Sequence, residues 1–266
     1  MFLLFFTFLA ALSPNYYAST EIHSTASFTS INSIEEISII LKEADNDTLI
    51  VFDIDEVLIT TKDPFLRPEA EPIFLSHVKE AMSQVKSALE QEAIEKKLSD
   101  CLVSCERYVL EPAAVELIEQ LQNMQKKVIA ITSHPTGKLG NLASVERWKV
   151  DSIKSFGFCF ERSFPDFRAS SPLYVEGVIF SRGSTKGDIL VQFLDQLSSF
   201  KPKKVIGIDD LVKNHETLRD SLAERGISYT GYWYRRAALK PEQIDAKHIA
   251  WQFQELMKTG VWKEDV

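Results

Sequence analysis

The chain has few cysteines, no long apolar run and no excess of basic residues. Among 266 residues there are 3 cysteines, and Lys and Arg (30) are outnumbered by Asp and Glu (38), which gives a net charge of -8. A nucleic-acid surface needs clustered Lys and Arg to neutralise phosphates, so we expect no nucleic-acid partner. This composition still allows one small phosphorylated molecule, held by a metal ion and one or two cationic side chains.

The cysteines form neither a disulfide framework nor a zinc site. Cys101 and Cys105 are one helical turn apart, where their Cβ vectors run side by side and fit a disulfide poorly. No second cysteine pair or nearby histidine completes a zinc site. We therefore expect both to be apolar residues on a helix face, and Cys159 to lie in the core.

The apolar N-terminus is too short to span a bilayer. Residues 2–12 are apolar apart from one threonine, whereas a membrane-spanning helix needs about 20 residues. The run is typical of a signal peptide, and residues 1–18 end in a passable cleavage site. We expect an exported protein, periplasmic or secreted, without stable membrane insertion after cleavage. The alternatives are an uncleaved anchor and a buried N-terminal helix.

The rest of the chain alternates short apolar strands with amphipathic helices. Residues 19–30 are rich in Ser and Thr and are interpreted as a loose linker. Strands are predicted at 48–54, 128–133, 203–210 and 227–234, and a hairpin arm at 173–181. Helices are predicted at 34–43, 73–109 (one bent helix or two, without a strand pattern), from Pro112, and at 141–155, 186–197, 213–225 and 244–257. Continuous apolar strands are typical of a parallel sheet with both faces covered, which predicts a doubly wound α/β fold.

Polar side chains stand where three of these strands end. They are Asp53 and Asp55, Thr132 and Ser133, and Asp209 and Asp210. The carboxyl ends of parallel strands meet at one edge of the sheet, which is where ligands bind. Clustered carboxylates raise one another's pKa unless a cation is present, and oxygen ligands without His or Cys favour Mg²⁺ over zinc. The alternative is that each pair is a solvated strand end or a helix cap.

Two common motifs can be set aside. Counted from Asp53, an EF-hand would need glycine where Leu58 stands and glutamate where Pro64 stands. The glycines of residues 177–187 do not have the spacing of a P-loop.

The ordered motifs resemble those of the haloacid-dehalogenase-like (HAD) superfamily. "FDIDEV" is similar to its first motif, "VIAITS" to its second, Lys186 in "STKGDIL" to its third, and "VIGIDD" to its acidic fourth. The set spans residues 49–214, and its order makes it specific. The chain is most similar to exported bacterial acid phosphatases of this superfamily or to an uncharacterised exported HAD-like group. The resemblance implies a Rossmann-like core.

The resemblance also implies a Mg²⁺-dependent phosphomonoester hydrolase that forms an aspartyl-phosphate. Asp53 would be the nucleophile and Asp55 the general acid and base. The phosphate would be bound by Thr132 or Ser133 and by Lys186, for which Arg182 is the alternative. The metal would be held by Asp53, the backbone carbonyl of Asp55, and Asp210 or Asp209. Glu56 is interpreted as a bystander, and His134 is left out of catalysis.

The helical stretch between the first two motifs resembles a cap. We expect residues 62–110 to form this cap, and residues 19–61 and 111–266 to form the core. A cap would exclude water and contact the leaving group, so it would set the choice of a small phosphorylated substrate. The alternative is a helical layer that never moves.

Two other functions remain open. A glycosyltransferase can use a D-x-D sequence to bind a metal and a nucleotide diphosphate, but it does not explain residues 132–133 or 209–210. A binding module of the same fold could also have lost turnover.

Overall fold

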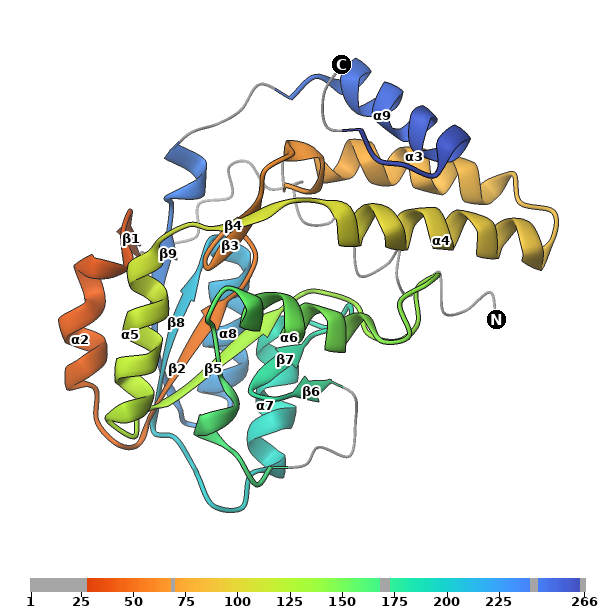
Figure 1. The fold of residues 1–266 in the computed structure, drawn as a ribbon. Coiled ribbons are helices and arrows are strands. Elements are labelled where there is room, and N and C mark those ends of the chain that lie inside the picture. Colours follow the sequence, from red (N-terminus) through yellow and green to blue (C-terminus); the bar gives the residue numbers. More distant parts are fainter. Residues whose placement is uncertain (1–27, 68–69, 168–172, 240–243, 264–266) are drawn as a thin grey trace.

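A computed structural model describes residues 28–67, 70–167, 173–239 and 244–263 (Figure 1). The predicted signal peptide, residues 1–18, lies outside these residues, as does most of the predicted linker. In the part of the chain that is described, no helix is both long enough and apolar enough to cross a membrane.

A seven-stranded sheet forms the centre of the protein, in the order β1-β9-β8-β2-β5-β7-β6. Its strands are β1 (Thr29–Ile31), β2 (Thr48–Asp53), β5 (Lys127–Thr132), β6 (Tyr174–Val175), β7 (Val178–Phe180), β8 (Lys204–Asp209) and β9 (Ser228–Tyr234). All neighbours are parallel except β6 and β7, which form the predicted hairpin arm. The predicted Rossmann-like α/β fold is confirmed.

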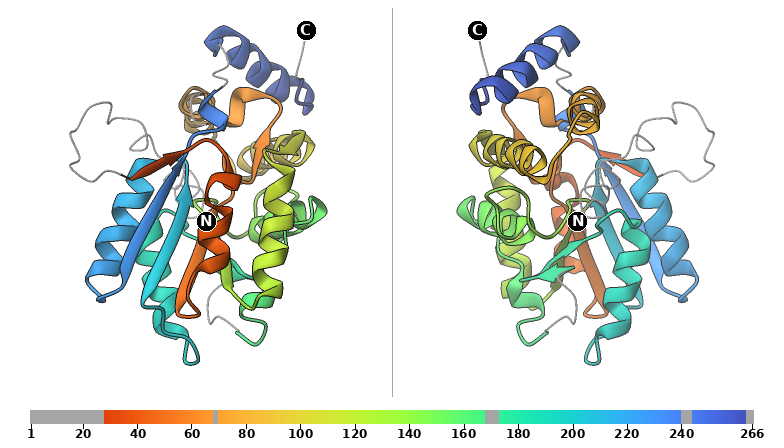
Figure 2. Two further views of the ribbon diagram at one scale, coloured as in Figure 1. Left: turned by 90° about the vertical axis from the view of Figure 1, so that its left-hand side faces the viewer. Right: turned by 90° about the vertical axis from the view of Figure 1, so that its right-hand side faces the viewer.

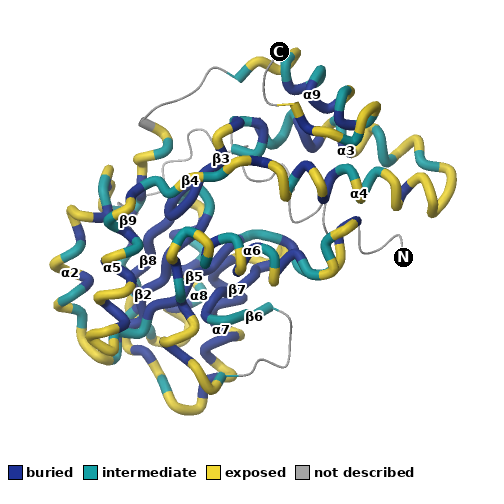
Figure 3. The backbone as a smooth tube through the Cα atoms, in the orientation of Figure 1, coloured by how far each residue is buried: buried dark blue, intermediate teal, exposed yellow. Residues whose placement is uncertain are grey.

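Helices cover both faces of the sheet (Figure 2). The 3-10 helix η2 (Ile34–Ile37) leads into α2 (Ser38–Glu43), which lies on one face with α5 (Pro112–Asn123) and α6 (Val145–Ser155); α7 (Lys186–Gln196) and α8 (Val212–Ala223) cover the other. Side chains of a strand alternate between faces, so in β2 Ile50 and Phe52 pack on the first face while Leu49 and Val51 pack on the second. The central strand β2 is therefore buried along its whole length (Figure 3).

A separate group of helices stands beyond the carboxyl ends of the strands. We call it the helical unit: η3 (Pro64–Leu66), α3 (Glu71–Ser83), α4 (Ala88–Ser104) and α9 (Ala246–Thr259). A two-stranded antiparallel stem, β3 (Ile59–Thr61) and β4 (Arg107–Val109), joins it to the core. Short 3-10 helices lie at Glu161–Ser163 and Ala237–Leu239.

The stem and the first strand differ from the predictions. The stretch 73–109 contains two helices, as one alternative held, but the prediction that it has no strand was wrong because β4 ends it. The linker prediction for 19–30 was wrong at its end, where β1 pairs with β9. Both strands are three residues long, and their pairing partners are distant in sequence.

The C-terminal helix α9 packs against α3 and α4. Asp63, just after the stem strand β3, links the stem to the C-terminal segment. Its Oδ2 accepts hydrogen bonds from Gln252 Nε2 (2.7 Å) and Trp262 Nε1 (3.0 Å). Cys101 and Cys105 are buried in the same apolar cluster. The helical unit thus combines two segments far apart in sequence.

Candidate active site and metal centre

Three neighbouring strands place the candidate residues at one edge of the sheet. Strand β2 lies between β5 and β8, so Asp53 at its end is flanked by Thr132 at the end of β5 and Asp209 at the end of β8. This geometry follows from the parallel order, because all three strands run toward the same edge.

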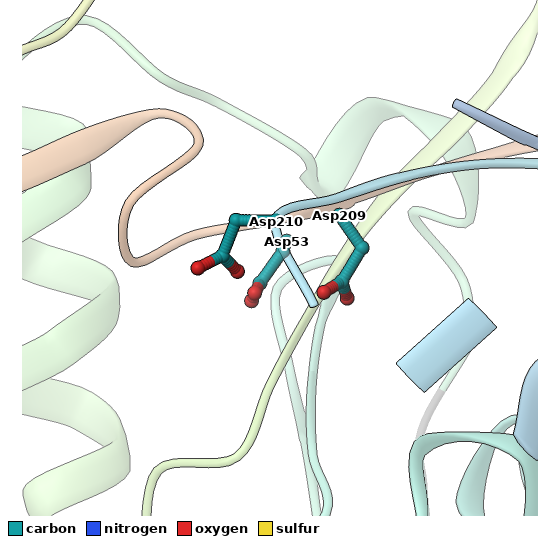
Figure 4. Close-up of side chains that lie close together, drawn as sticks. All are labelled: Asp53, Asp209 and Asp210. Carbon is teal, nitrogen blue, oxygen red and sulfur yellow. The ribbon is translucent and has the colours of Figure 1, made fainter. Parts of the chain in front are cut away.

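Asp53, Asp209 and Asp210 form an acidic cluster. Each offers one carboxylate oxygen, and the three oxygens lie within 4.8 Å of one another (Figure 4). Asp209 is already bonded on both oxygens: Oδ1 accepts from Leu211 N (2.9 Å) and Asn214 Nδ2 (2.8 Å), and Oδ2 from Lys186 Nζ (2.8 Å). Asp210 is partly exposed and borders the cavity described below.

Lys186 is the cation of this cluster. Its Nζ lies 2.7 Å from Asp53 Oδ1 and 2.8 Å from Asp209 Oδ2, and its side chain is 2% exposed. Lys186 is the first residue of α7, whose close packing on α8 requires glycine at the next position: a Cβ on Gly187 would lie 2.1 Å from the backbone oxygen of Thr217. Arg182, the alternative cation, is exposed.

The acidic cluster fits a divalent metal ion. Burial raises the pKa of Asp53, and burial together with the charges of Asp209 and Asp53 raises the pKa of Asp210 well above its ordinary value. Lys186 balances only part of this charge, so a cation would stabilise the ionised forms. The donors are all carboxylate oxygens, which a hard ion such as Mg²⁺ prefers.

Asp55 is turned toward a different cation. Its Oδ1 lies 2.5 Å from Lys149 Nζ, and its Oδ2 accepts a hydrogen bond from Thr132 Oγ1 (3.3 Å). Burial opposes ionisation of Asp55, but the charge and the hydrogen bond of Lys149, with a smaller effect of Arg107, outweigh it and hold the pKa of Asp55 at about 2. The Asp55 carboxylate is therefore separate from the acidic cluster.

Sequence reasoning missed Lys149, whose side chain is 1% exposed. The signal was its place on α6, one helical turn after Val145 and one before Ile153, both of which are buried. A buried lysine on the apolar face of an amphipathic helix needs an acidic partner, and the half-exposed carboxylate of Asp55 is that partner here.

Ser133, His134 and Glu56 also border the site. Burial and the charge of Lys149 lower the pKa of His134 to about 3, so this side chain is neutral at neutral pH. Glu56 has a positive φ of 60° and accepts a hydrogen bond from Thr60 Oγ1 (2.6 Å). Glu56 therefore has a buried structural partner in the stem strand β3.

These residues open into a cavity of about 190 Å³ between the sheet edge and the helical unit. Asp53, Asp55 and Asp210 line its core side, and side chains of η3, α3 and α4 line the other. A family model described as "Protein of unknown function (DUF2608)" matches residues 30–264, which includes both sides. The chain belongs to the DUF2608 family.

Relatives of this DUF2608 protein come from Rickettsia and Chlamydia species. An uncharacterised protein of Rickettsia prowazekii is 25% identical over 243 residues, covering 88% of this chain and 86% of the relative. A protein of Chlamydia pneumoniae, whose name assigns it provisionally to the outer membrane, is 27% identical over 244 residues, covering 90% and 86%. No solved structure matches the chain.

Glu71 is the acidic residue that the helical unit contributes to the cavity. Burial, with a smaller effect of the charge of Asp55, raises its pKa from 4.5 to about 7. Between about pH 4.5 and pH 7, Glu71 is therefore protonated in the folded protein and ionised in the unfolded chain. Its contribution to stability is full below about pH 4.5 and is lost as the pH rises through 7.

Replacing Glu71 with glutamine should therefore stabilise this DUF2608 protein only at higher pH. We expect the free energy of unfolding to rise by about 2 kcal/mol at pH 8 and to change little at pH 4.5, as measured by urea unfolding in chelator. Glu80→Gln, at an exposed position of the same helix, should have no such pH dependence. Equal effects of Glu71→Gln at both pH values would contradict the burial of a neutral carboxyl.

Proposed function

We propose that this DUF2608 protein is an exported, Mg²⁺-dependent phosphomonoester hydrolase of the HAD-like type. The observation that carries the proposal is the environment of Asp53, which stands at the end of the central strand between a buried ammonium and two further aspartates. A carboxylate in such a place is well suited to attack a phosphorus atom, since the cations beside it screen the approaching phosphate.

The proposed roles follow the contacts of each side chain. Asp53 attacks phosphorus and carries the phosphoryl group, while Lys186, 2.7 Å away, balances the charge on both. Asp55 donates a proton to the leaving oxygen in the first step and accepts a proton from the attacking water in the second. Thr132 or Ser133 binds a phosphate oxygen from the neighbouring strand end. In water attack the ionised Asp55 acts as the base, which suits its pairing with Lys149.

Asp53 and Asp210 are the proposed side-chain ligands of the metal, with the backbone carbonyl of Asp55. When bound, Mg²⁺ would stabilise the charge that develops on the phosphoryl oxygens. Asp209, whose oxygens are taken by Lys186, Leu211 and Asn214, holds the cluster in place behind them.

Export is supported by two independent signs. The predicted signal peptide covers residues 1–18, and the Chlamydia pneumoniae relative carries a name that places it provisionally in the outer membrane. The substrate would then be a small phosphorylated molecule outside the cytoplasm.

A phosphate-binding module without turnover is the second candidate function. The pair between the buried Lys149 and the half-exposed Asp55 favours it, because a carboxylate held by an ammonium at 2.5 Å must leave that partner before it donates a proton.

The metal dependence of turnover tests the proposal. Release of p-nitrophenol from p-nitrophenyl phosphate should require Mg²⁺, stop in EDTA, and return when excess Mg²⁺ is added. A thermal unfolding scan should show that Mg²⁺ raises the melting temperature, since the ion binds only the folded acidic cluster. Hydrolysis that continues unchanged in EDTA would overturn the proposal. A melting temperature that rises with Mg²⁺ and beryllium fluoride, without hydrolysis, would favour the binding module.

A further inference from the structure

The cavity above Asp53 has a charged side and an apolar side. The charged side is the sheet edge with Asp53, Asp55 and Asp210. The apolar side belongs to η3, α3 and α4 and is lined by Phe65, Phe74, Leu75, Val78, Leu98 and Leu102. A phosphate bound at Asp53 would therefore have its leaving group among these apolar side chains.

The wall that η3, α3 and α4 form has few polar groups to offer a hydroxylated ligand. Arg107 lies on the stem strand β4, where it donates to the backbone oxygen of Cys105 (2.7 Å) and lies 5.0 Å from the centre of the Trp148 ring. Glu71 is the acidic residue that the helical unit adds to the lining. Each buried hydroxyl left without a partner costs about 1–3 kcal/mol, whereas each buried methylene contributes about 0.8 kcal/mol.

The size of the cavity limits the leaving group as well. An apolar protein cavity of about 150 Å³ holds one benzene molecule. The cavity here is about 190 Å³ and would also take in the phosphate. It has room for one ring or a short branched chain beside the phosphate.

We propose that the substrate is a phosphomonoester of a small apolar alcohol or phenol, selected by the wall of α3 and α4. This inference rests on the proposed phosphatase function. It adds that the helical unit excludes sugar and nucleotide phosphates, because their hydroxyls would be buried without partners.

The test compares two esters of similar shape that differ in their polar ring substituents. Cyclohexylmethyl phosphate has nearly the shape of glucose 6-phosphate and the same primary ester linkage, but lacks the hydroxyls and the ring oxygen. With Mg²⁺ and the wild-type protein, kcat/KM for cyclohexylmethyl phosphate should be higher by about 100-fold or more. Because both leaving groups are primary alcohols, the difference reports on the pocket.

A variant of the apolar wall provides the second arm. Leu102 lines the cavity and is half-buried, so Leu102→Gln should leave the core packed. It should reduce the preference for cyclohexylmethyl phosphate by about 10-fold, mainly through a higher KM. Leu89→Gln is the matched control, because Leu89 lies on the same helix with 78% of its surface exposed, and the preference should not change.

The outcomes separate this inference from the function on which it rests. Suppose that p-nitrophenyl phosphate is hydrolysed with Mg²⁺. If kcat/KM for glucose 6-phosphate then equals that for cyclohexylmethyl phosphate, or if neither ester is hydrolysed, the proposed apolar selection is wrong and the proposed phosphatase function is retained. If no ester is hydrolysed, the proposed function itself fails. A preference that Leu102→Gln leaves unchanged, in a variant with the wild-type melting temperature, would also overturn the role of the wall.

Discussion

Replacing Asp53 with asparagine is expected to lower the rate of phosphate release by at least about 10⁴-fold. The amide has the same shape as the carboxylate but cannot attack phosphorus, so no aspartyl-phosphate can form. The measurement is kcat with p-nitrophenyl phosphate at saturating Mg²⁺. A variant that keeps more than a tenth of the wild-type rate would show that Asp53 is not the nucleophile.

The same variant should remain folded, which separates loss of chemistry from loss of structure. An asparagine oxygen can still accept the hydrogen bond from Ile54 N (2.7 Å), and Lys186 keeps its contact with Asp209 (2.8 Å). Since one of several repelling carboxylates is removed, the melting temperature in EDTA should not fall. The rise caused by Mg²⁺ should shrink, because the cluster has lost a ligand.

Asp45→Asn is the matched control for both measurements. Asp45 is exposed and precedes the opposite, amino end of the same strand. Its variant should keep the wild-type rate and the wild-type response to Mg²⁺. A large fall in melting temperature for Asp53→Asn in EDTA would mean that the carboxylate is needed for folding. The loss of turnover would then reflect loss of structure, and the role of Asp53 as nucleophile would lose its support.

The central strands of the sheet could be predicted because the information that specifies them is local in the sequence. Residues 49–52 and 205–208 are continuous apolar runs followed by acidic residues, a pattern that is typical of a parallel strand buried on both faces. The strands β1 and β4 could not be predicted in this way. Each has three residues, so its stability depends on a partner strand that lies far away in the sequence.

The packing of the helical unit also could not be predicted, because it depends on a partner far away in the sequence. The amphipathic pattern of 73–104 predicts helices, but it does not show what covers their apolar faces. The cover is α9, more than a hundred residues later, and its position depends on the two hydrogen bonds to Asp63. A pattern of period 3.6 indicates that a face is buried, and leaves the partner open.

The site residues at strand ends could be predicted from the sequence, whereas those that come from helices could not. Asp53 and Asp209 follow from the parallel topology, and Lys186 from the motif that begins α7. Lys149 and Glu71 reach the cavity from α6 and α3, whose rotation about their own axes is set by packing. The pairing of Asp55 with Lys149 is therefore a tertiary contact, and it changes the expected chemistry of Asp55 more than any residue in the motif does.

Replacing Lys186 with methionine is expected to destabilise the metal-free protein strongly. The apolar side chain fills similar space but leaves Asp53 and Asp209, both buried, without their ammonium. Removing one partner of a buried ion pair costs about 3–5 kcal/mol, to be measured as the free energy of unfolding by urea in EDTA. Turnover should fall by about 10³-fold or more, because no buried cation then neutralises the phosphoryl group at this position.

Mg²⁺ should restore part of the stability that the Lys186→Met variant loses. Such a recovery would show that Lys186 balances the charge of the acidic cluster. A divalent cation among Asp53, Asp209 and Asp210 would offset the repulsion that the ammonium no longer offsets, so the variant should gain more stability from Mg²⁺ than the wild type does. Arg182→Met, which removes an exposed cation from the preceding turn, should change neither stability nor turnover. If Lys186→Met lost the same free energy with and without Mg²⁺, the lysine would serve packing alone, and the charge balance proposed for Asp53 would be wrong.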